Sequence, residues 1–170
     1  MKYVEAPEPY DPRPGDGPLI FLAGGITNCP DWQRDARGLL ADAPVVVLNP
    51  RRARFDPSAG DTNEQQVCWE YRHLQRADVV MFWFPASPEP TVQPIALFEL
   101  GAVSVEACHG MRRLVVGADG RYARRPDVEL QLRLRCPELV VHRSLPDTVR
   151  AALAAALGPA SEALVGSPPD

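Results

Sequence analysis

Five short apolar runs alternate with stretches of helical spacing, and this alternation limits the folds open to the chain. The runs are rich in β-branched or aromatic residues and comprise residues 19–23 (LIFLA), 45–48 (VVVL), 78–84 (DVVMFWF), 113–117 (RLVVG) and 138–142 (ELVVH). Parallel strands that are covered on both faces have this composition. Strands that alternate with helices form parallel sheets through crossover connections. The sequence therefore predicts an α/β fold with a five-stranded parallel sheet.

Apolar residues at helical spacing predict helices between and after these strands. The helices are expected to begin after Pro30, to cover residues 62–76, to begin at Pro94, and to cover residues 147–157. The second helix is expected to turn Val67, Tyr71 and Leu74 inward, opposite a polar stripe that includes Glu70. Residues 127–136 alternate so regularly that a helix or a strand fits them.

Composition limits the class of protein. The 170 residues are enough for one domain, with 45% apolar and 24% charged residues, as in ordinary soluble proteins. A net charge of −4 argues against binding to a nucleic acid polymer or an anionic membrane. No apolar stretch approaches the ~20 residues of a membrane span, and no signal-peptide core follows Met1. We therefore expect a cytoplasmic protein.

Cysteine and histidine spacing gives no support for a metal site. Cys29, Cys68, Cys108 and Cys136 lie far apart and form no CxxC pair, and the three histidines are scattered. The spacing predicts reduced, mostly buried thiols rather than disulfides or a zinc site. Neither a metal nor a cofactor is expected.

Prolines and glycines mark the two ends of the chain. Residues 5–18 contain five prolines, which predicts that residues 1–18 form an extended surface leader. Residues 159–170 are expected to be a flexible tail. The domain itself is predicted to cover residues 19–158.

Ligands of open parallel sheets bind beyond the carboxyl ends of the strands. Glycines there allow close approach of a ligand, arginines can hold a phosphate or carboxylate, and a terminal aromatic can stack on a planar ring. The candidates are Gly24, Gly25 and Thr27 after the first run, Asn49, Arg51 and Arg52 after the second, and Trp83 in the third. The alternatives are a tight turn, solvated arginines and a core aromatic. We expect Gly24, Asn49 and Trp83 to converge with Glu99 on one cleft.

Two glutamates stand out on the predicted helices. Glu99 interrupts the apolar run 93–102 (QPIALFELGA), and its helical neighbours offer it no hydrogen bond. The alternative is a half-exposed glutamate on a stripe with Glu106. Glu70 lies on the preceding helix, where the alternative is a solvated face paired with His73.

Four motifs, FLAGGIT, NPRR, WEYRHLQRADVVMFWFP and QPIALFELGA, occur in this order over about residues 19–117. Together they resemble the nucleoside 2-deoxyribosyltransferase family. The resemblance implies a flavodoxin-like three-layer sandwich and cleavage of the N-glycosidic bond of a nucleoside or nucleotide. Some members pass the sugar to another base, and close relatives pass it from nucleoside 5′-monophosphates to water. The family also implies a homo-oligomer.

The resemblance assigns roles to four residues. Glu99 falls on the nucleophile of the ELG motif, since a carboxylate can trap the sugar C1′ as a glycosyl ester. Glu70 falls on a second carboxylate that assists the departing base. Gln93 replaces a base-contacting aspartate, and Phe21 replaces a tyrosine that orients the nucleophile. Because Phe21 has no donor, we expect another group, Thr27, to keep Glu99 ionised.

The sequence thus predicts an enzyme that passes a ribosyl or deoxyribosyl group to another base through a glycosyl-Glu99 intermediate. Hydrolysis of a nucleoside 5′-monophosphate is one alternative. A nucleotide-binding module without catalysis is another.

Overall fold

The computed structural model describes residues 1–54, 62–87 and 91–158. The strands are β1 (Lys2–Glu5), β2 (Leu19–Gly24), β3 (Val46–Asn49), β4 (Val79–Phe84), β5 (Arg113–Ala118) and β6 (Val141–His142). The helices are α1 (Trp32–Leu39), α2 (Thr62–Arg76), α3 (Pro94–Cys108), α4 (Arg125–Arg135) and α5 (Leu145–Leu157). The predicted tail, residues 159–170, lies outside the described residues.

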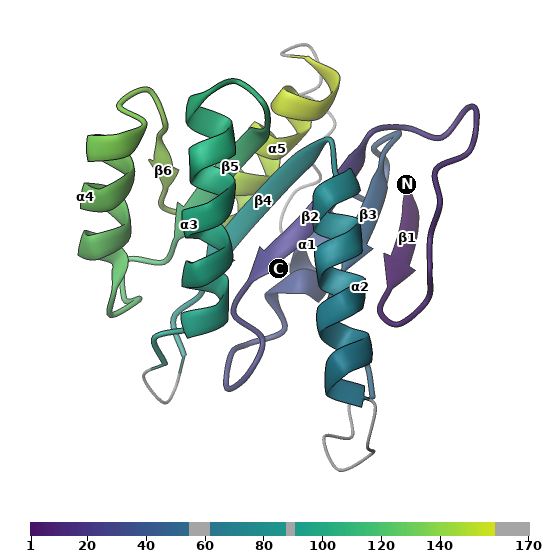
Figure 1. The fold of residues 1–170 in the computed structure, drawn as a ribbon, viewed down its shortest axis with the longest axis horizontal. Coiled ribbons are helices and arrows are strands. Elements are labelled where there is room, and N and C mark those ends of the chain that lie inside the picture. Colours follow the sequence, from purple (N-terminus) through teal and green to yellow (C-terminus); the bar gives the residue numbers. More distant parts are fainter. Residues whose placement is uncertain (55–61, 88–90, 159–170) are drawn as a thin grey trace.

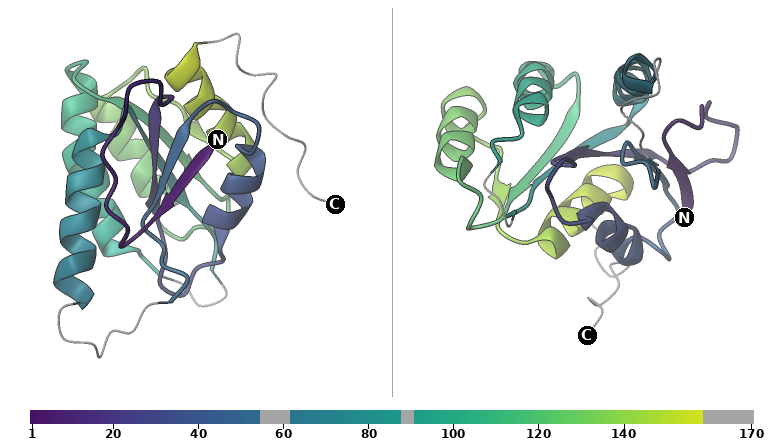
Figure 2. Two further views of the ribbon diagram at one scale, coloured as in Figure 1. Left: turned by 90° about the vertical axis from the view of Figure 1, so that its right-hand side faces the viewer. Right: turned by 90° about the horizontal axis from the view of Figure 1, so that it is seen from below.

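The strands form one all-parallel sheet in the order β1-β3-β2-β4-β5-β6. Helices α2, α3 and α4 cover one face of this sheet, and α1 and α5 cover the other (Figures 1 and 2). Without β1, the strand order is that of flavodoxin-like proteins. The predicted flavodoxin-like sandwich is therefore confirmed, with one strand more than expected.

Alternate residues of the central strands face opposite layers. In β4, Val80, Phe82 and Phe84 pack beneath α2 and α3, whereas Met81 and Trp83 pack against α1 and α5. Side chains in a strand alternate between the two faces, and both faces of this strand are covered. The near-continuous apolar run follows from that double coverage.

The additional strand comes from the segment that was expected to be a surface leader. Residues 2–5 pair with β3 along the edge of the sheet, and Val4, Ala6 and Tyr10 are buried. The backbone after β1 is tied to α2, because the Trp69 indole donates to the carbonyl of Glu8 at 2.7 Å. We call residues 6–16 the strap. The sequence of β1, KYVE, forms no continuous apolar run and precedes a proline-rich stretch, which explains the wrong expectation.

The structure settles the ambiguous segment as helix α4. Val128 and Leu132, four residues apart, are both buried, and Pro126 occupies the first turn, where a missing N–H costs nothing. Among the described residues, no helix has the length and apolar content needed to cross a membrane.

Helix α2 buries a different face from the one predicted. Leu74 is buried as expected, but Val67 and Tyr71 are exposed, and Trp69 and His73 occupy the inner positions instead. The His73 ring contacts the Trp69 carbonyl through Nδ1 and accepts the backbone N–H of Tyr10 at Nε2. These hydrogen bonds offset the cost of burying the imidazole. The strap therefore decides which side of α2 is inside.

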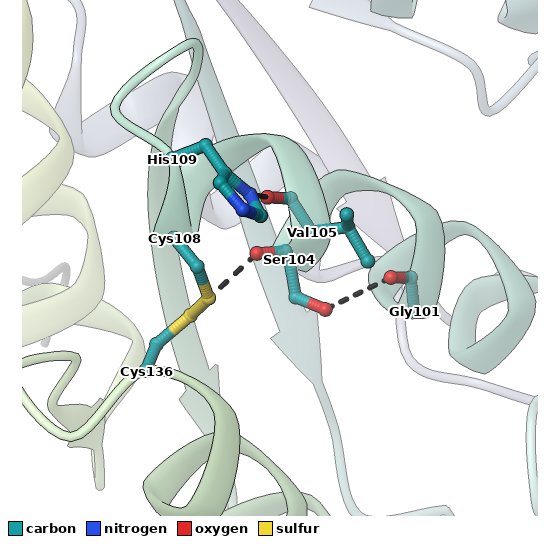
Figure 3. The surroundings of a disulfide bond; sticks show 6 residues. All are labelled: Gly101, Ser104, Val105, Cys108, His109 and Cys136. Atoms are coloured by element: carbon teal, nitrogen blue, oxygen red, sulfur yellow. Dashed lines mark hydrogen bonds between the residues drawn. A yellow bond between two sulfur atoms is a disulfide. The ribbon is translucent and has the colours of Figure 1, made fainter.

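The cysteines also depart from the prediction. Cys108 and Cys136 form a disulfide between the carboxyl ends of α3 and α4 (Figure 3), Cys29 is a buried thiol, and Cys68 is exposed. The two bonded cysteines are 28 positions apart in the chain, but the packing of α3 beside α4 brings their Cα atoms to 5.4 Å. That separation is normal for a disulfide, and only the tertiary fold creates it.

Candidate active site

A cavity of about 560 Å³ opens between α2 and α3, beyond the carboxyl end of β2. Its position follows from the fold, because the connections after β2 and β3 and the beginning of α3 all meet at this edge of the sheet (Figure 1). The predicted site residues that line it are Glu70, Glu99, Phe21, Gly24, Gly25, Thr27, Arg51, Arg52 and Gln93.

Two predicted residues do not line this cavity. Trp83 faces the α1–α5 layer, because strand alternation places it on the opposite side of the sheet from Phe82. Asn49 is buried, and its amide donates to the Tyr3 hydroxyl at 2.6 Å and to the Arg51 carbonyl at 3.0 Å. Asn49 therefore fixes the end of β3. The expected convergence with Glu99 holds for Gly24 alone.

The glycine turn after β2 is required by close packing. Gly24 has a φ of 139°, a conformation that side-chain-bearing residues rarely adopt. A Cβ at Gly25 would lie 2.3 Å from Oε1 of Gln93 and 2.6 Å from Sγ of Cys29. The Trp32 indole donates to the Gly25 carbonyl at 2.8 Å and holds the turn. The turn thus shapes the cavity floor.

Arg51 lines the cavity, but its guanidinium is occupied by the loop before α1. It donates to the Pro30 carbonyl at 2.8 Å, to the Cys29 carbonyl at 3.1 Å and to the Gln33 side chain at 3.2 Å. These contacts give Arg51 a structural role. Arg52, the second arginine of the predicted pair, also lines the cavity, and its Nε donates to the Gln66 side chain.

Arg52, Gln66 and Glu70 form a chain of hydrogen bonds along one wall. Nε of Arg52 donates to Oε1 of Gln66 at 2.5 Å, and Nε2 of Gln66 donates to Oε1 of Glu70 at 2.7 Å. Burial raises the pKa of Glu70, while the Gln66 hydrogen bond and the Arg52 charge act to lower it. Glu70 is therefore a desolvated carboxyl that is connected to the Arg52 guanidinium through the Gln66 amide.

Glu99 has a different environment on the opposite wall. Burial, with a smaller effect from the negative charge of Glu70, raises the pKa of Glu99 from 4.5 to about 7. In the described part of the chain no group donates a hydrogen bond to Glu99, Thr27 included. The expectation that Thr27 keeps Glu99 ionised is thus not met, because Thr27 is exposed at the rim. At neutral pH the Glu99 carboxyl is partly protonated.

Gln93 caps α3 in a strained conformation. Its φ of 49° places it in the left-handed region, although it is not glycine. Nε2 faces the Pro85 carbonyl at 3.4 Å, whereas Oε1 is buried with no hydrogen-bond partner within the described ranges. A buried acceptor without a partner is costly and is well suited to receive an N–H group from a ligand.

Sequence reasoning did not place Gln66 in the site, and it missed the apolar rim formed by Val67 and Ile95. Gln66 had one usable signal, its spacing of four residues from Glu70 on a helix. The apolar rim had no usable sequence signal, because apolar residues at helical spacing are normally assigned to the core.

The site consists of two desolvated carboxyls on neighbouring helices, an arginine and an unpaired amide oxygen around one cavity. Across the described residues no group of three or more His, Cys, Asp or Glu side chains is placed to hold a metal ion. The fold and site define an α/β protein with paired carboxylates at the carboxyl edge of its sheet, an arrangement that suits glycosyl chemistry.

A family model described as "nucleoside 2-deoxyribosyltransferase like" matches residues 17–119. The chain therefore belongs to this family. The matched range runs from the start of β2 through β5 and contains every residue that lines the cavity. No curated protein matches the chain.

Proposed function

We propose that the protein cleaves the N-glycosidic bond of a nucleoside or nucleotide through a glycosyl-Glu99 intermediate and passes the sugar to a second base. The observation that carries this proposal is the pair of carboxyls, Glu70 and Glu99, which line one cavity and interact electrostatically. Membership of the nucleoside 2-deoxyribosyltransferase-like family supports the same substrate class.

The first half of the reaction uses the two carboxyls in different roles. The ionised Glu99 attacks C1′ of the sugar, the bond from C1′ to the base nitrogen breaks, and its electron pair leaves with the base. Glu70, in its protonated form, gives a proton to the departing base. In the second half, a nitrogen of the incoming base attacks C1′, the ester breaks, and its electron pair returns to the Glu99 carboxylate. The ionised Glu70 takes the proton from that nitrogen and is thereby restored to its protonated form.

The surroundings of the cavity suit a nucleoside. Oε1 of Gln93 can accept an N–H of the base, and the glycine turn lets the backbone approach the sugar. The positively charged guanidinium of Arg52 can interact with a 5′-phosphate or with the base. The apolar walls exclude water and strengthen the interaction between Glu99 and the developing positive charge.

The protonation states predict a dependence of rate on pH. Glu99 must be ionised to attack, and its pKa is about 7. Because Glu70 must be protonated in the same step, we expect kcat/KM to show a bell-shaped dependence on pH, with two limbs that belong to the coupled pair. A profile that is flat between about pH 5 and 8 would contradict the role of Glu99.

The direct test is incubation of the protein with a panel of nucleosides and 5′-monophosphates, with and without an added free base. Transfer is shown if the added base appears in a new nucleoside. Release of base without incorporation shows hydrolysis to the free sugar or sugar phosphate. Binding without any base release would indicate a nucleotide-binding module. With a 2′-fluoro analogue, mass spectrometry should detect a sugar adduct on the peptide that contains Glu99.

We also propose that the protein is a homo-oligomer. Val67, Tyr71, Ile95 and Phe98 are exposed apolar residues on α2 and α3, and we call them the α2–α3 patch. Val67 and Ile95 also line the cavity, so the patch borders the site. Exposed apolar patches of this kind mark interaction surfaces, and a second copy is the partner that the family suggests.

A further inference from the structure

We propose that Gln66 is a positioning residue that orients Glu70, connects it to the charge of Arg52, and determines which oxygen of Glu70 carries the transferable proton. This inference rests on the proposed function only in that the Glu70 proton is transferred to the departing base. The arrangement itself is a property of the site without substrate.

The orientation of the Gln66 amide follows from its partners. The guanidinium of Arg52 can only donate, so the amide atom that faces it at 2.5 Å must be oxygen. The backbone carbonyl of Pro50 can only accept, so the amide atom at 2.7 Å from it must be nitrogen. Both contacts fix the same orientation, and the side chain is buried. The second N–H of the amide therefore points to Glu70.

This orientation distinguishes the two oxygens of Glu70. Oε1 accepts the Gln66 N–H at 2.7 Å, which disfavours a proton on that atom. A proton bound by Glu70 consequently resides on Oε2. The charged and titratable groups that face Glu70 are Arg52 from the connection after β3 and Glu99 from α3. Gln66 lies between Glu70 and the Arg52 guanidinium, and the Arg52 charge polarises the Gln66 amide that donates to Glu70.

Gln66 also limits how Glu70 can move. The amide is anchored outside α2 by the carbonyl of Pro50 and the guanidinium of Arg52, both of which follow β3. Glu70 is thereby held in position relative to the sheet as well as to its own helix. A carboxyl held in this way reaches the leaving base in one geometry, which is the condition for efficient proton transfer.

The test measures the titration of Glu70 without substrate. In protein labelled with ¹³C at glutamate carboxyls, the Glu70 resonance is assigned by its loss in Glu70→Gln. In Gln66→Met, which keeps the volume and removes the donor, we expect the midpoint to rise by about 1 pH unit, the effect of losing one charge-assisted hydrogen bond. Gln65→Met, at the exposed neighbouring position, is the matched control and should leave the midpoint unchanged.

Two further variants cover a failure of Gln66→Met to fold. Gln66→Glu can accept from Arg52 but cannot donate to Glu70 when ionised, so it should also raise the midpoint. Arg52→Gln perturbs the chain from outside α2 and should shift the midpoint in the same direction. An unchanged Glu70 midpoint in a folded Gln66 variant, or in Arg52→Gln when neither Gln66 variant folds, overturns the proposal.

Kinetics separate this proposal from the proposed function. If the wild-type protein releases base, Gln66→Met should lower kcat about tenfold with a smaller change in KM, and should move the Glu70-dependent limb to higher pH. If the wild type releases no base but the NMR midpoint still shifts, the reaction is wrong and the positioning stands. If base is released and the Glu70 midpoint does not shift, the proposed reaction stands and the positioning role of Gln66 is wrong.

Discussion

Glu99 is a half-buried carboxyl whose charge the fold does little to compensate. Burial and the charge of Glu70 raise its pKa to about 7, and none of the described groups donates a hydrogen bond to it. A residue that destabilises the folded state in this way is typical of a functional site rather than of a structural position. The same property makes Glu99 testable through stability as well as through activity.

Replacement of Glu99 by glutamine should stabilise the protein at alkaline pH and abolish base release. The folded protein holds the Glu99 proton more tightly than the unfolded chain, so Glu99 costs stability as the pH rises from 4.5 through about 7. Glu99→Gln removes this cost, worth of the order of 1–3 kcal/mol above that range. Urea unfolding at about pH 8 and about pH 4 measures the difference in the free energy of unfolding between Glu99→Gln and the wild type. This difference should vanish at the lower pH.

Glutamine cannot form the glycosyl ester, so activity should fall by about 1,000-fold or more. Glu138→Gln, which alters an exposed glutamate, is the control for both measurements. If Glu99→Gln is less stable than the wild type at alkaline pH, the Glu99 carboxylate stabilises the folded protein and the prediction is wrong.

At the scale of elements, the strap and α2 form one unit through His73. The imidazole is buried and neutral, with Nδ1–H donating to the Trp69 carbonyl and Nε2 accepting the Tyr10 N–H. Burial, assisted by the charges of Arg76 and Arg72, lowers the pKa of His73 from 6.5. Protonation at Nε2 would remove the acceptor and break this hydrogen bond between the strap and α2.

Acid should therefore weaken the protein through His73. As the pH falls below 6.5, the unfolded chain binds a proton at His73 more readily than the folded protein, so stability is lost in that direction. His73→Gln retains a side-chain acceptor but does not titrate, and it should lose less stability between about pH 7 and 5 than the wild type. Urea midpoints across this range provide the measurement. His109→Gln, at an exposed histidine, should follow the wild type, and an identical decline in His73→Gln would refute this role.

The second connection between elements is the disulfide that joins α3 to α4. The closed loop has a sequence separation of 28 residues. Loop entropy predicts that its loss destabilises the protein by about 3.5 kcal/mol. The double substitution Cys108→Ser with Cys136→Ser should show this loss in urea unfolding, and wild-type protein treated with a reducing agent should match it. A reducing agent without effect on the wild type would show that the bond does not contribute.

At the scale of the whole molecule, the α2–α3 patch places exposed apolar surface beside the candidate active-site cavity. Tyr71 and Phe98 are 70% and 77% exposed, which is unusual for large apolar side chains on neighbouring helices. Burial of this patch in a second copy would also narrow the mouth of the cavity. The oligomer and the site are then parts of one arrangement.

Charges introduced into the patch should therefore dissociate the protein. Tyr71→Glu with Phe98→Glu is expected to give monomers in light scattering at concentrations where the wild type is oligomeric, because two buried carboxylates would face an apolar surface. Leu134→Glu, which alters a comparably exposed leucine on α4, is the control and should leave the assembly intact. A monomeric wild type would remove the oligomer from the proposal.

Much of the fold could be predicted from sequence because its signals are local. Continuous apolar runs mark β2 to β5, and helical spacing marks α1, α2, α3 and α5. The prediction failed where an element has no continuous apolar run or where a distant segment decides. β1 contains only two apolar residues, Tyr3 and Val4, and the inner face of α2 depends on the strap, which lies about sixty residues earlier in the chain.

The sequence by itself determined the parallel sheet and the candidate carboxyls, because apolar periodicity and the unusual position of Glu99 are properties of neighbouring residues. The tertiary structure alone decided that Trp83 faces away from the site, that Arg51 holds a loop, and that Gln66 connects Arg52 to Glu70. It also decided that Cys108 meets Cys136. These facts depend on distances between segments that are far apart in the chain, and such distances exist only once the helices have packed on the sheet.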